Sequence, residues 1–384
     1  MRILHLCLAS TYADNYAYQE NIIPKYHKKD GNEVFIVTSL FTFDSKGKGS
    51  YFKEATTYKN EHDIEVTRLN YKHSNKFCRL FRRYSGTYEA IEKCSPDVIF
   101  IHNVQFMDIK YVVKYLKKHP EVKVYADNHC DYINSASNWV SKNILHKIIW
   151  RSCAKKIEPY VTKFYGVLPA RVDFLKDIYA LPKEKVELLV MGADDEDVNE
   201  AKKPEIRKEI REKYGIKDDD FLIISGGKID SNKPETLHLM KAMFSLPDNI
   251  KLMVFGSVVP SLKEEFDKLL ANPNIIYIGW VHSTEVYKYF ASAELGVFPG
   301  LHSVLWEQAI GVGLPCVFKK MKGIDHIDID GNCILIENTN EDSLTDCINK
   351  IYNDKELYTN MKKVSEEKGM KEFSYQDIAR RSIM

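Results

Sequence analysis

The chain alternates short apolar runs with helical patterns over most of its length. Runs at 2–8, 33–38 and 98–102 are bounded by polar or turn residues, and a helical pattern separates each run from the next. Continuous apolar runs of this length are typical of strands buried on both faces of a parallel sheet, and strand–helix alternation is typical of doubly wound α/β domains. The sequence therefore predicts parallel sheets covered by helices.

The alternation breaks once, in a highly charged segment between 193 and 220. A second series of apolar runs follows it, at 221–227, 251–257, 275–281, 294–300, 316–320 and 333–337. At 384 residues the chain is long enough for two domains. We expect two Rossmann-like domains facing across a cleft, with these bounds: an N-terminal domain at 1–193, a C-terminal domain at 194–370 and a terminal helix at 371–384.

The segment from Val297 to Val317 contains the most specific candidate site. An apolar run leads into a Pro-Gly turn, and the helix that follows ends at Gly313 and Pro315. Backbone N–H groups at such a helix start attract an anion, and the carboxylate of Glu307 could bind the vicinal hydroxyls of a ribose. This pattern fits a nucleotide-sugar site with Ser303 and Val304 at the anion, and it equally fits an ordinary strand–helix unit in which Glu307 is solvated.

Neighbouring runs of the second series also end in glycine or turn residues. Gly227, Gly256 and the residues around Val281 come at the ends of three runs, the side on which open α/β sheets bind ligands. Lys228 and Lys233 frame the first of these loops, and two ammonium groups there suit a diphosphate. Surface lysines without a role are the alternative.

Other ligand classes have no motif in the sequence. GxGxxG and GxxxxGK[ST] are both missing, which argues against a dinucleotide cofactor and a P-loop nucleotide site. The acidic clusters at 194–195 and 218–220 lie in charged linker sequence, so we expect no metal site and no cofactor. The eight cysteines form no CxxC pair and fit reduced thiols. No segment suggests nucleic-acid binding, a signal peptide or a membrane span, so we expect a cytoplasmic protein.

The front half carries two further candidates. His129 follows an apolar run, where it could contact a sugar or adjust the charge near a reacting centre, although a loop histidine without a role is equally compatible. Residues 138–156 form a basic amphipathic helical pattern that could lie on an anionic membrane surface. A core-packed helix with solvated lysines is the favoured interpretation of this pattern. Basic residues outnumber acidic ones in 1–190 and the reverse holds in 191–384, which suggests an anionic partner for the front half.

Several segments together resemble GT-B glycosyltransferases of the retaining family 4 type. PDVIFIH is similar to a family strand that ends in histidine, ADNHCDY to the "xxHD" segment, and SGGKIDSNKPE to "GR-x4-KG" with Lys228 in place of arginine. FSYQDIARR is similar to the family's terminal helix, which returns toward the front domain. The longest match runs from Ile278 to Val317.

The resemblance implies a metal-independent, retaining transfer of a sugar from a nucleotide-sugar, with a UDP-sugar as the expected donor. The implied acceptor is a saccharide or a lipid-linked saccharide in surface-polysaccharide assembly, at the inner face of the cytoplasmic membrane. His129, Lys228 and Lys233 would be catalytic. The donor nucleotide would contact Gly227, Gly256, Val281, Ser303, Val304 and Glu307, and the acceptor would contact Asp14, Asn15 and Tyr16.

The chain departs from the family pattern at one important place. Pro299 stands where the first acid of the family's EX7E pair is expected, and only the second acid, Glu307, is present. Two other functions therefore stay open. One is a GT-B-fold nucleotide-sugar epimerase, and the other is a catalytically silent relative that binds a sugar nucleotide.

Overall fold

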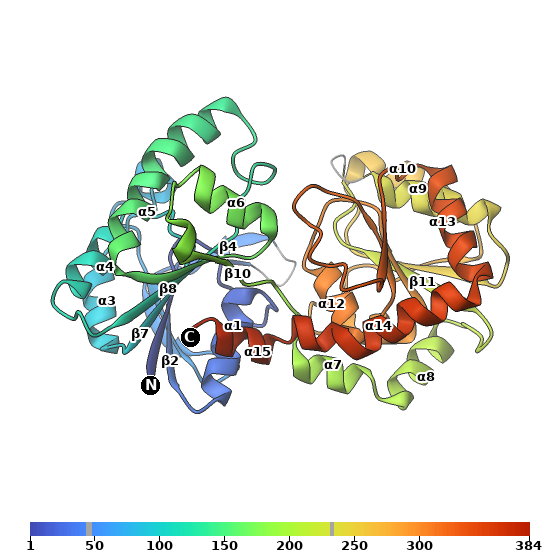
Figure 1. The fold of residues 1–384 in the computed structure, drawn as a ribbon, viewed down its shortest axis with the longest axis horizontal. Coiled ribbons are helices and arrows are strands. Elements are labelled where there is room, and N and C mark those ends of the chain that lie inside the picture. The colour runs from blue at the N-terminus through green and yellow to red at the C-terminus, as the bar shows by residue number, and fades with distance from the viewer. Residues whose placement is uncertain (44–47, 231–233) are drawn as a thin grey trace. The chain divides into compact units, whose positions relative to one another are not determined.

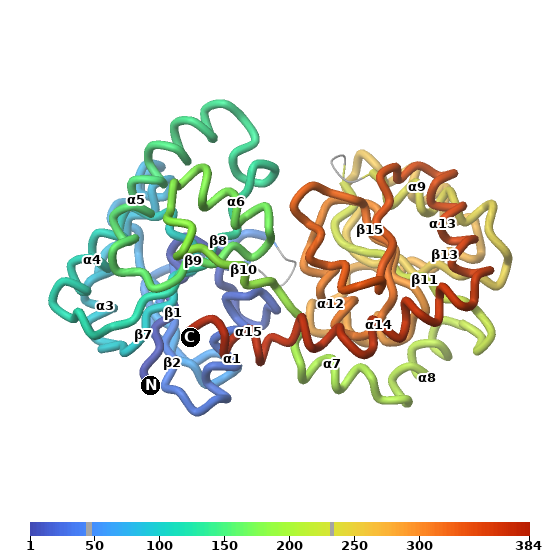
Figure 2. The backbone as a smooth tube through the Cα atoms, viewed as in Figure 1, coloured from blue at the N-terminus to red at the C-terminus, as the bar shows by residue number. Residues whose placement is uncertain are grey.

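A computed structural model describes residues 1–43, 48–230 and 234–384. The chain forms two compact units, and the second is inserted into the first. Unit 1 comprises Met1–Met191 and Tyr375–Met384, and unit 2 comprises Gly192–Ser374. Figure 2 shows the backbone leaving unit 1 once and returning to it only at the C-terminal helix. Each unit is an α/β domain built on its own sheet, so the predicted α/β class is confirmed.

Unit 1 is built on an eight-stranded sheet with the order β10-β9-β8-β7-β1-β2-β6-β5. All neighbouring strands are parallel except β5, which runs antiparallel to β6 at the edge. A separate antiparallel hairpin consists of β3 (Phe41–Phe43) and β4 (Gly49–Tyr51). The sheet strands are β1 (Arg2–Cys7), β2 (Glu33–Ser39), β5 (Thr56–Lys59), β6 (Glu65–Leu69), β7 (Val98–His102), β8 (Lys123–Asn128), β9 (Val161–Gly166) and β10 (Val186–Leu188).

Helices cover both faces of this sheet (Figure 1). Successive residues of β1 point to opposite faces, so Leu4 joins one buried cluster and Ile3 another. The cluster with Leu4 includes residues of α3, α4, α5 and α6, and the cluster with Ile3 includes residues of α1 and α15. The helices are α1 (Gln19–Lys29), α2 (Lys76–Leu80), α3 (Thr87–Cys94), α4 (Ile109–Leu116), α5 (Arg151–Ile157), α6 (Pro169–Asp177) and α15 (Tyr375–Arg381), with short 3₁₀ turns η2 (Glu158–Tyr160) and η3 (Lys183–Lys185).

The basic helical pattern forms a π-helix, η1 (Ser141–Trp150), which continues into α5. Only His146 and Trp150 of η1 are buried. Large apolar side chains stay exposed on this segment, including Trp139 at 69% and Ile148 at 63%. One side of this helix nevertheless packs on the core as expected, through Trp150 with Leu145 and Ile149, so the exposed apolar side chains are additional to a core-packed face.

Unit 2 is built on a six-stranded, fully parallel sheet with the order β13-β12-β11-β14-β15-β16. Its strands are β11 (Phe221–Gly226), β12 (Ile250–Phe255), β13 (Ile275–Tyr277), β14 (Leu295–Phe298), β15 (Cys316–Lys319) and β16 (Cys333–Ile336). The helices are α7 (Asp195–Ala201), α8 (Pro204–Lys213), α9 (Glu235–Ala242), α10 (Lys263–Leu269), α11 (Val286–Ser292), α12 (Leu305–Val312), α13 (Glu341–Asn353) and α14 (Lys355–Phe373), with 3₁₀ turns η4 (Met243–Ser245) and η5 (Pro260–Leu262).

Candidate functional site

The carboxyl ends of β11 and β14 and the start of α12 enclose a small hollow in unit 2. Three of the residues predicted to bind a nucleotide-sugar line it: Gly227, Lys228 and Ser303. Its volume of about 90 Å³ is well below the roughly 300–1,000 Å³ of sites that enclose a whole ligand. The hollow can therefore take part of a nucleotide, such as a phosphate group, next to the positive end of the α12 dipole.

The glycines at these strand ends allow two backbones to approach closely. Gly227 and Gly256 have φ angles of +119° and +120°, which side-chain-bearing residues avoid. The N–H group of Gly227 donates to the carbonyl of Phe255 at 3.1 Å, and a Cβ atom on Gly256 would lie 1.8 Å from the carbonyl oxygen of Gly227. Gly256 therefore shapes the Gly227 turn, and the space beside it is already filled by protein.

Of the two lysines predicted to bind the diphosphate, the structure describes only Lys228. Lys228 is 64% exposed, and its Nζ lies 3.0 Å from Oδ2 of Asp230. A phosphate would compete with this carboxylate for the ammonium group. Lys233 lies outside the described residues.

Glu307 is the most deeply buried of the predicted site residues. It lies in the first turn of α12 with no exposed surface, so the interpretation of a solvated carboxylate is wrong. Its Oε1 accepts from Nε2 of His302 at 2.8 Å and from Nε2 of His326 at 2.9 Å. Burial alone would raise the pKa of Glu307, but the two imidazoles outweigh burial and hold the pKa at about 2.

The same three side chains could hold a metal ion. The ligand atoms of His302, Glu307 and His326 all lie within 4.8 Å of one another. Oε2 of Glu307 and Nδ1 of His326 are buried and have no hydrogen-bond partner among the described residues. Two histidines and a carboxylate are suitable ligands for zinc or another divalent transition metal.

Two other predicted donor residues, Val304 and Val281, do not line the hollow. Val304 is the residue before α12, and its carbonyl accepts from the N–H of Gln308 at 3.0 Å. Val281 is half-buried in the loop that follows β13, next to Trp280, which is 58% exposed. Their place at strand ends agrees with the predicted side of the sheet.

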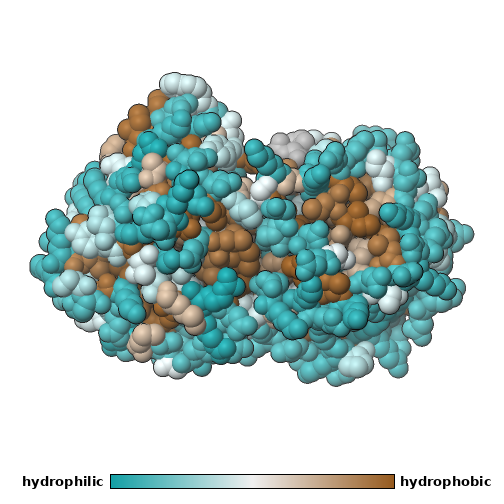
Figure 3. Space-filling model, viewed as in Figure 1, coloured by the Kyte–Doolittle hydropathy of each residue, from teal (hydrophilic) through white to brown (hydrophobic). Residues whose placement is uncertain are grey.

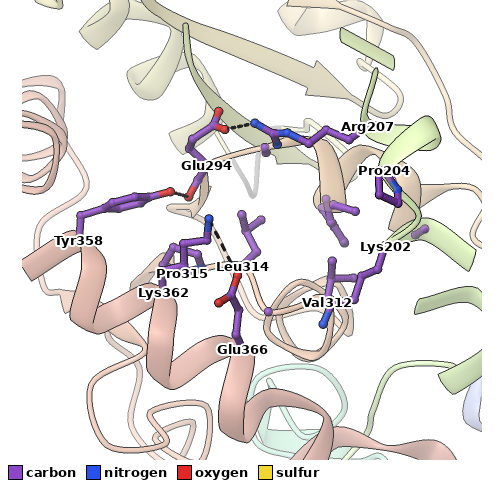
Figure 4. Close-up of a pocket in the computed structure, with 15 residues that line it drawn as sticks. Lys202, Pro204, Arg207, Glu294, Val312, Leu314, Pro315, Tyr358, Lys362 and Glu366 are labelled. Carbon is purple, nitrogen blue, oxygen red and sulfur yellow. Dashed lines mark hydrogen bonds and ion pairs between the residues drawn. The ribbon is translucent and has the colours of Figure 1, made fainter. Parts of the chain in front are cut away.

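A larger cavity of about 380 Å³ lies elsewhere in unit 2 (Figure 4). Its lining includes Glu294 and Pro315, which come immediately before β14 and β15, so it lies at the amino ends of these strands. Arg207 there pairs with Glu294, and Lys362 lies 3.9 Å from Glu366. This cavity is therefore separate from the strand ends that α/β sheets use for nucleotides.

In unit 1, His129 lies in the loop after β8 and is fixed by its neighbours. Its backbone N–H donates to Oδ1 of Asn103 at 2.9 Å, and its Nε2 lies 3.5 Å from Oδ2 of the buried Asp127. Burial alone would lower the pKa of His129, but Asp127 outweighs burial, and the pKa is raised. The side chain keeps 22% of its surface exposed, whereas its Nε2 atom is buried.

The three predicted acceptor residues lie together in the loop after β1. Asp14 is half-buried, and its Oδ2 accepts from the hydroxyl of Tyr58 at 2.7 Å. Asn15 is exposed and has a positive φ of 62°. Tyr16 stacks on Tyr18 with ring centroids 5.3 Å apart. The hydrogen bond of Asp14 thus holds the loop in place. Asn15 is the residue of the three that is open to solvent.

Sequence reasoning missed the side chains that contact Glu307 and His129. In the sequence, His302 is recognisable only as a polar residue shortly before α12. His326 lies in the loop between β15 and β16, with no motif around it. Asp127 belongs to the segment ADNHCDY, but its contact with His102 depends on the pairing of β7 with β8. That pairing could not be derived from spacing alone.

Comparison with known proteins identifies the C-terminal half of the chain. Residues 206–368 match the family model "Glycosyl transferases group 1". An uncharacterized glycosyltransferase of Methanocaldococcus jannaschii is 24% identical over 220 residues, which is 54% of this chain and 55% of that protein. The chain therefore spans about half the length of this curated relative in the match.

Solved structures match the whole chain. Anabaena Alr3699/HepE, in complex with UDP and glucose, has a TM-score of 0.66 at 12% identity, and the match covers 99% of this chain and 98% of that one. WaaG, a glycosyltransferase involved in lipopolysaccharide biosynthesis, has a TM-score of 0.64 at 16% identity, with coverage of 100% and 99%. The fold is thus that of the two-domain GT-B proteins. Within this class, the segment 206–368 is similar to the group 1 glycosyltransferases.

Proposed function

We propose that the protein is a retaining glycosyltransferase that moves a sugar from a UDP-sugar to a saccharide or lipid-linked saccharide. One observation carries the proposal: Gly227, Lys228 and Ser303 line one hollow at the strand ends of the unit that contains the group 1 segment. A phosphate in this hollow meets an ammonium group and a helix start at the same time.

In this proposal the donor diphosphate lies between Lys228, Lys233 and the N–H groups of Ser303 and Val304. These groups stabilise the negative charge that grows on the diphosphate as it leaves, so they carry most of the rate enhancement without a metal ion. The base lies near Gly256 and Val281. Glu307 binds the ribose through Oε2, which requires His302 or His326 to move aside, because the carboxylate is fully buried.

The proposed acceptor side uses His129 and the loop after β1. His129 is partly exposed and is held by Asn103 and Asp127, so it can contact the sugar at the reacting centre. Asn15 and Tyr16 contact the acceptor. The stacked rings of Tyr16 and Tyr18 offer faces on which a sugar ring can pack.

We further propose that unit 1 contacts an anionic membrane surface through η1 and the residues just before it. Figure 3 shows hydrophobic side chains on the outer edge of this helical arm, and Trp139, Ile144 and Ile148 are exposed. Lys142 and Lys147 lie on the same element, and such a mixture suits a surface of anionic lipids. No helix in the described part of the chain is long and apolar enough to cross a bilayer. A membrane-facing acceptor in surface-polysaccharide assembly would fit this placement.

The test is a two-step measurement on the full-length protein. A thermal-shift screen against UDP-, GDP- and ADP-sugars should show stabilisation by a UDP-sugar, because a ligand that binds only the folded state raises the melting temperature. Release of UDP from that donor then tests transfer. Binding without release would favour the silent relative, and conversion of the donor to an epimer without acceptor would favour an epimerase. Either result would overturn the transferase proposal.

A further inference from the structure

Three buried histidines and one aspartate in unit 1 form a continuous hydrogen-bonded chain. Nδ1 of His102 lies 2.8 Å from Oδ2 of Asp127, and Nε2 of His102 lies 3.0 Å from Nδ1 of His5. Nε2 of His5 lies 3.0 Å from Nδ1 of His27, whose Nε2 lies 2.7 Å from the carbonyl oxygen of Ala379 in α15. The four side chains are at most 1% exposed. This hydrogen-bonded chain of side chains thus joins the end of β8, just before His129, to the C-terminal helix α15.

The shortest contact at each end of this hydrogen-bonded chain is with an oxygen that can only accept, although the hydroxyl of Ser382 also lies 3.3 Å from Nε2 of His27. At one end is the carbonyl of Ala379, which also accepts from the hydroxyl of Ser382 at 2.7 Å. Because two acceptors would repel each other at 2.7 Å, Nε2 of His27 must carry a hydrogen. At the other end, Oδ1 of Asp127 accepts from the N–H of Asn103 at 3.0 Å. Burial alone would raise the pKa of Asp127, but His102 and His129 outweigh burial and lower it, so this end is an ionised carboxylate.

Counting hydrogens shows that the chain holds one excess proton. Its four junctions need one hydrogen each, and three neutral imidazoles supply only three. One histidine must therefore be an imidazolium. His102 is the one in contact with the carboxylate, where a positive charge is best stabilised. Burial lowers the pKa of His5, and it lowers that of His27 to about 4, so these two remain neutral. Each then carries its hydrogen on Nε2.

The position of α15 decides this arrangement. Figures 1 and 2 show α15 beside α1, which carries His27. If the Ala379 carbonyl were removed from Nε2 of His27, three hydrogens would satisfy the remaining three junctions. His27 would donate to His5, His5 to His102 and His102 to Asp127, with every imidazole neutral. When α15 packs against His27, the hydrogen-bonded chain therefore takes up one proton from solvent, and no other chemical change is needed.

The charge on His102 also acts on the candidate site. Asp127 lies between His102 and His129 and contacts both. With an imidazolium at His102 the carboxylate is already compensated, so it attracts a proton to His129 less strongly than a lone carboxylate would. The other charged groups that act on His129 are Glu20 and Arg171. Near the opposite end, Asp30 acts on His27, and its carboxylate pairs with Arg380 of α15 at 3.1 Å.

We propose that the seating of α15 on His27 places one excess proton in this chain, and that the resulting His102 imidazolium sets the charge of His129 through Asp127. His27, His5 and His102 are thus positioning residues. The role of His129 in turnover rests on the proposed function, whereas the proton count and the tautomers do not.

The first test reads the tautomers directly. Full-length protein labelled with ¹⁵N at histidine is observed by long-range ¹H–¹⁵N spectra at pH 7. We expect His102 with both ring nitrogens protonated, and His5 and His27 neutral with the hydrogen on Nε2. A neutral His102, or a hydrogen on Nδ1 of His5 or His27 instead of Nε2, would overturn the proposal.

The second test compares two substitutions at the far end of the chain. His27→Phe removes both ring nitrogens, so His102 should become neutral at pH 7 and the NMR titration of His129 should move upward by about one pH unit. His27→Gln keeps a donor for Ala379 and an acceptor for His5, so both signals should stay as in the wild type. His238→Phe in unit 2 is the matched control, because its Nδ1 contacts only the carbonyl of Thr339 within the described contacts.

Activity gives an independent readout. If the protein turns over a UDP-sugar, the limb of the kcat–pH profile that belongs to His129 should move with the NMR titration in His27→Phe and return in His27→Gln. An unmoved His129 titration in His27→Phe would refute the relay, whatever the activity. Absence of turnover with the expected NMR shifts would instead refute the proposed function and leave the relay intact.

Discussion

The Nε2 atom of His302 lies 2.8 Å from Oε1 of Glu307, at the start of α12. The histidine and the carboxylate are on opposite sides of the loop-to-helix transition, so their contact fixes the entry into the helix beside the candidate phosphate hollow. His326 adds a second contact to the same oxygen at 2.9 Å. A carboxylate that the sequence suggests for ribose binding therefore also holds the local structure together.

Glu307 should make the stability of unit 2 depend on pH. Its pKa in the folded protein is about 2, below the ordinary value of 4.5, so its contribution is fully present above about pH 4.5 and is lost as the pH falls toward 2. Glu307→Gln should cost on the order of 3 kcal/mol at pH 7, and the difference should shrink below about pH 4.5. Urea denaturation from pH 7 to pH 3.5 measures it. Glu264→Gln, at a side chain 86% exposed, is the control and should change little. A penalty for Glu307→Gln that stays constant with pH would contradict the pKa assignment.

Gly256 should tolerate substitution far less well than Gly279. Both have positive φ angles, so alanine costs about 1 kcal/mol at either position through backbone strain. A Cβ atom on Gly256 would also lie 1.8 Å from the Gly227 carbonyl oxygen, whereas a Cβ on Gly279 meets nothing within 4 Å. Gly256→Ala should therefore lower the denaturation midpoint several times more than Gly279→Ala. Equal losses would show that the Gly227 turn can move aside freely.

The sheets could be predicted from the sequence because their strands are nearly all buried. The runs at 2–8, 98–102 and 221–227 correspond to β1, β7 and β11, where apolar content and strand coincide. Strands β3 and β5 gave no such signal, since their side chains are only half-buried and many are polar. Partial exposure at a sheet edge or in a hairpin weakens the apolar pattern on which the prediction depends.

The candidate site was predictable only in part, for a related reason. The strand-end glycines and the residues around Ser303 could be predicted from their spacing along the sequence. The contacts that set the charge of the site could not be predicted in this way. His302 and His326 contact Glu307 only after β14, β15 and their loops are in place. Likewise, His5 and His102 are single histidines in apolar runs until β1 pairs with β7. Sequence periodicity identifies elements, whereas these contacts follow from strand order.

Chelation should leave turnover unchanged. In the proposed mechanism the diphosphate charge is met by lysines and backbone N–H groups, so prolonged treatment with EDTA should not alter the rate of UDP release. Loss of activity that zinc or manganese restores would contradict this prediction. If His326→Ala then prevented the restoration, the metal would be assigned to His302, Glu307 and His326.

Removing two exposed side chains near η1 should weaken membrane binding. Trp139→Ser with Ile148→Ser should lower sedimentation with anionic phosphatidylglycerol vesicles about tenfold, because two apolar groups no longer leave water. Phe244→Ser in unit 2 is a matched control, since Phe244 is also exposed, at 57%. Binding should fall with added salt, as expected for Lys142 and Lys147 near anionic headgroups. Equal binding of the double variant and the control would exclude η1 as the contact surface.

Lys228→Ala should slow UDP release by about 100- to 1,000-fold, the range found when one charge-stabilising donor is removed from a reacting centre. Most of the loss should appear in kcat, because the leaving diphosphate carries more charge than the bound donor and so interacts more strongly with the ammonium group. Lys228→Arg keeps the cation and should recover much of the rate. Lys268→Ala is the control, since this lysine is 73% exposed on α10 and pairs with Glu264. Because Lys228 is itself 64% exposed and its ion pair among the described residues is with Asp230, its removal should leave the melting temperature nearly unchanged. A wild-type rate in Lys228→Ala would show that the diphosphate does not bind at the end of β11.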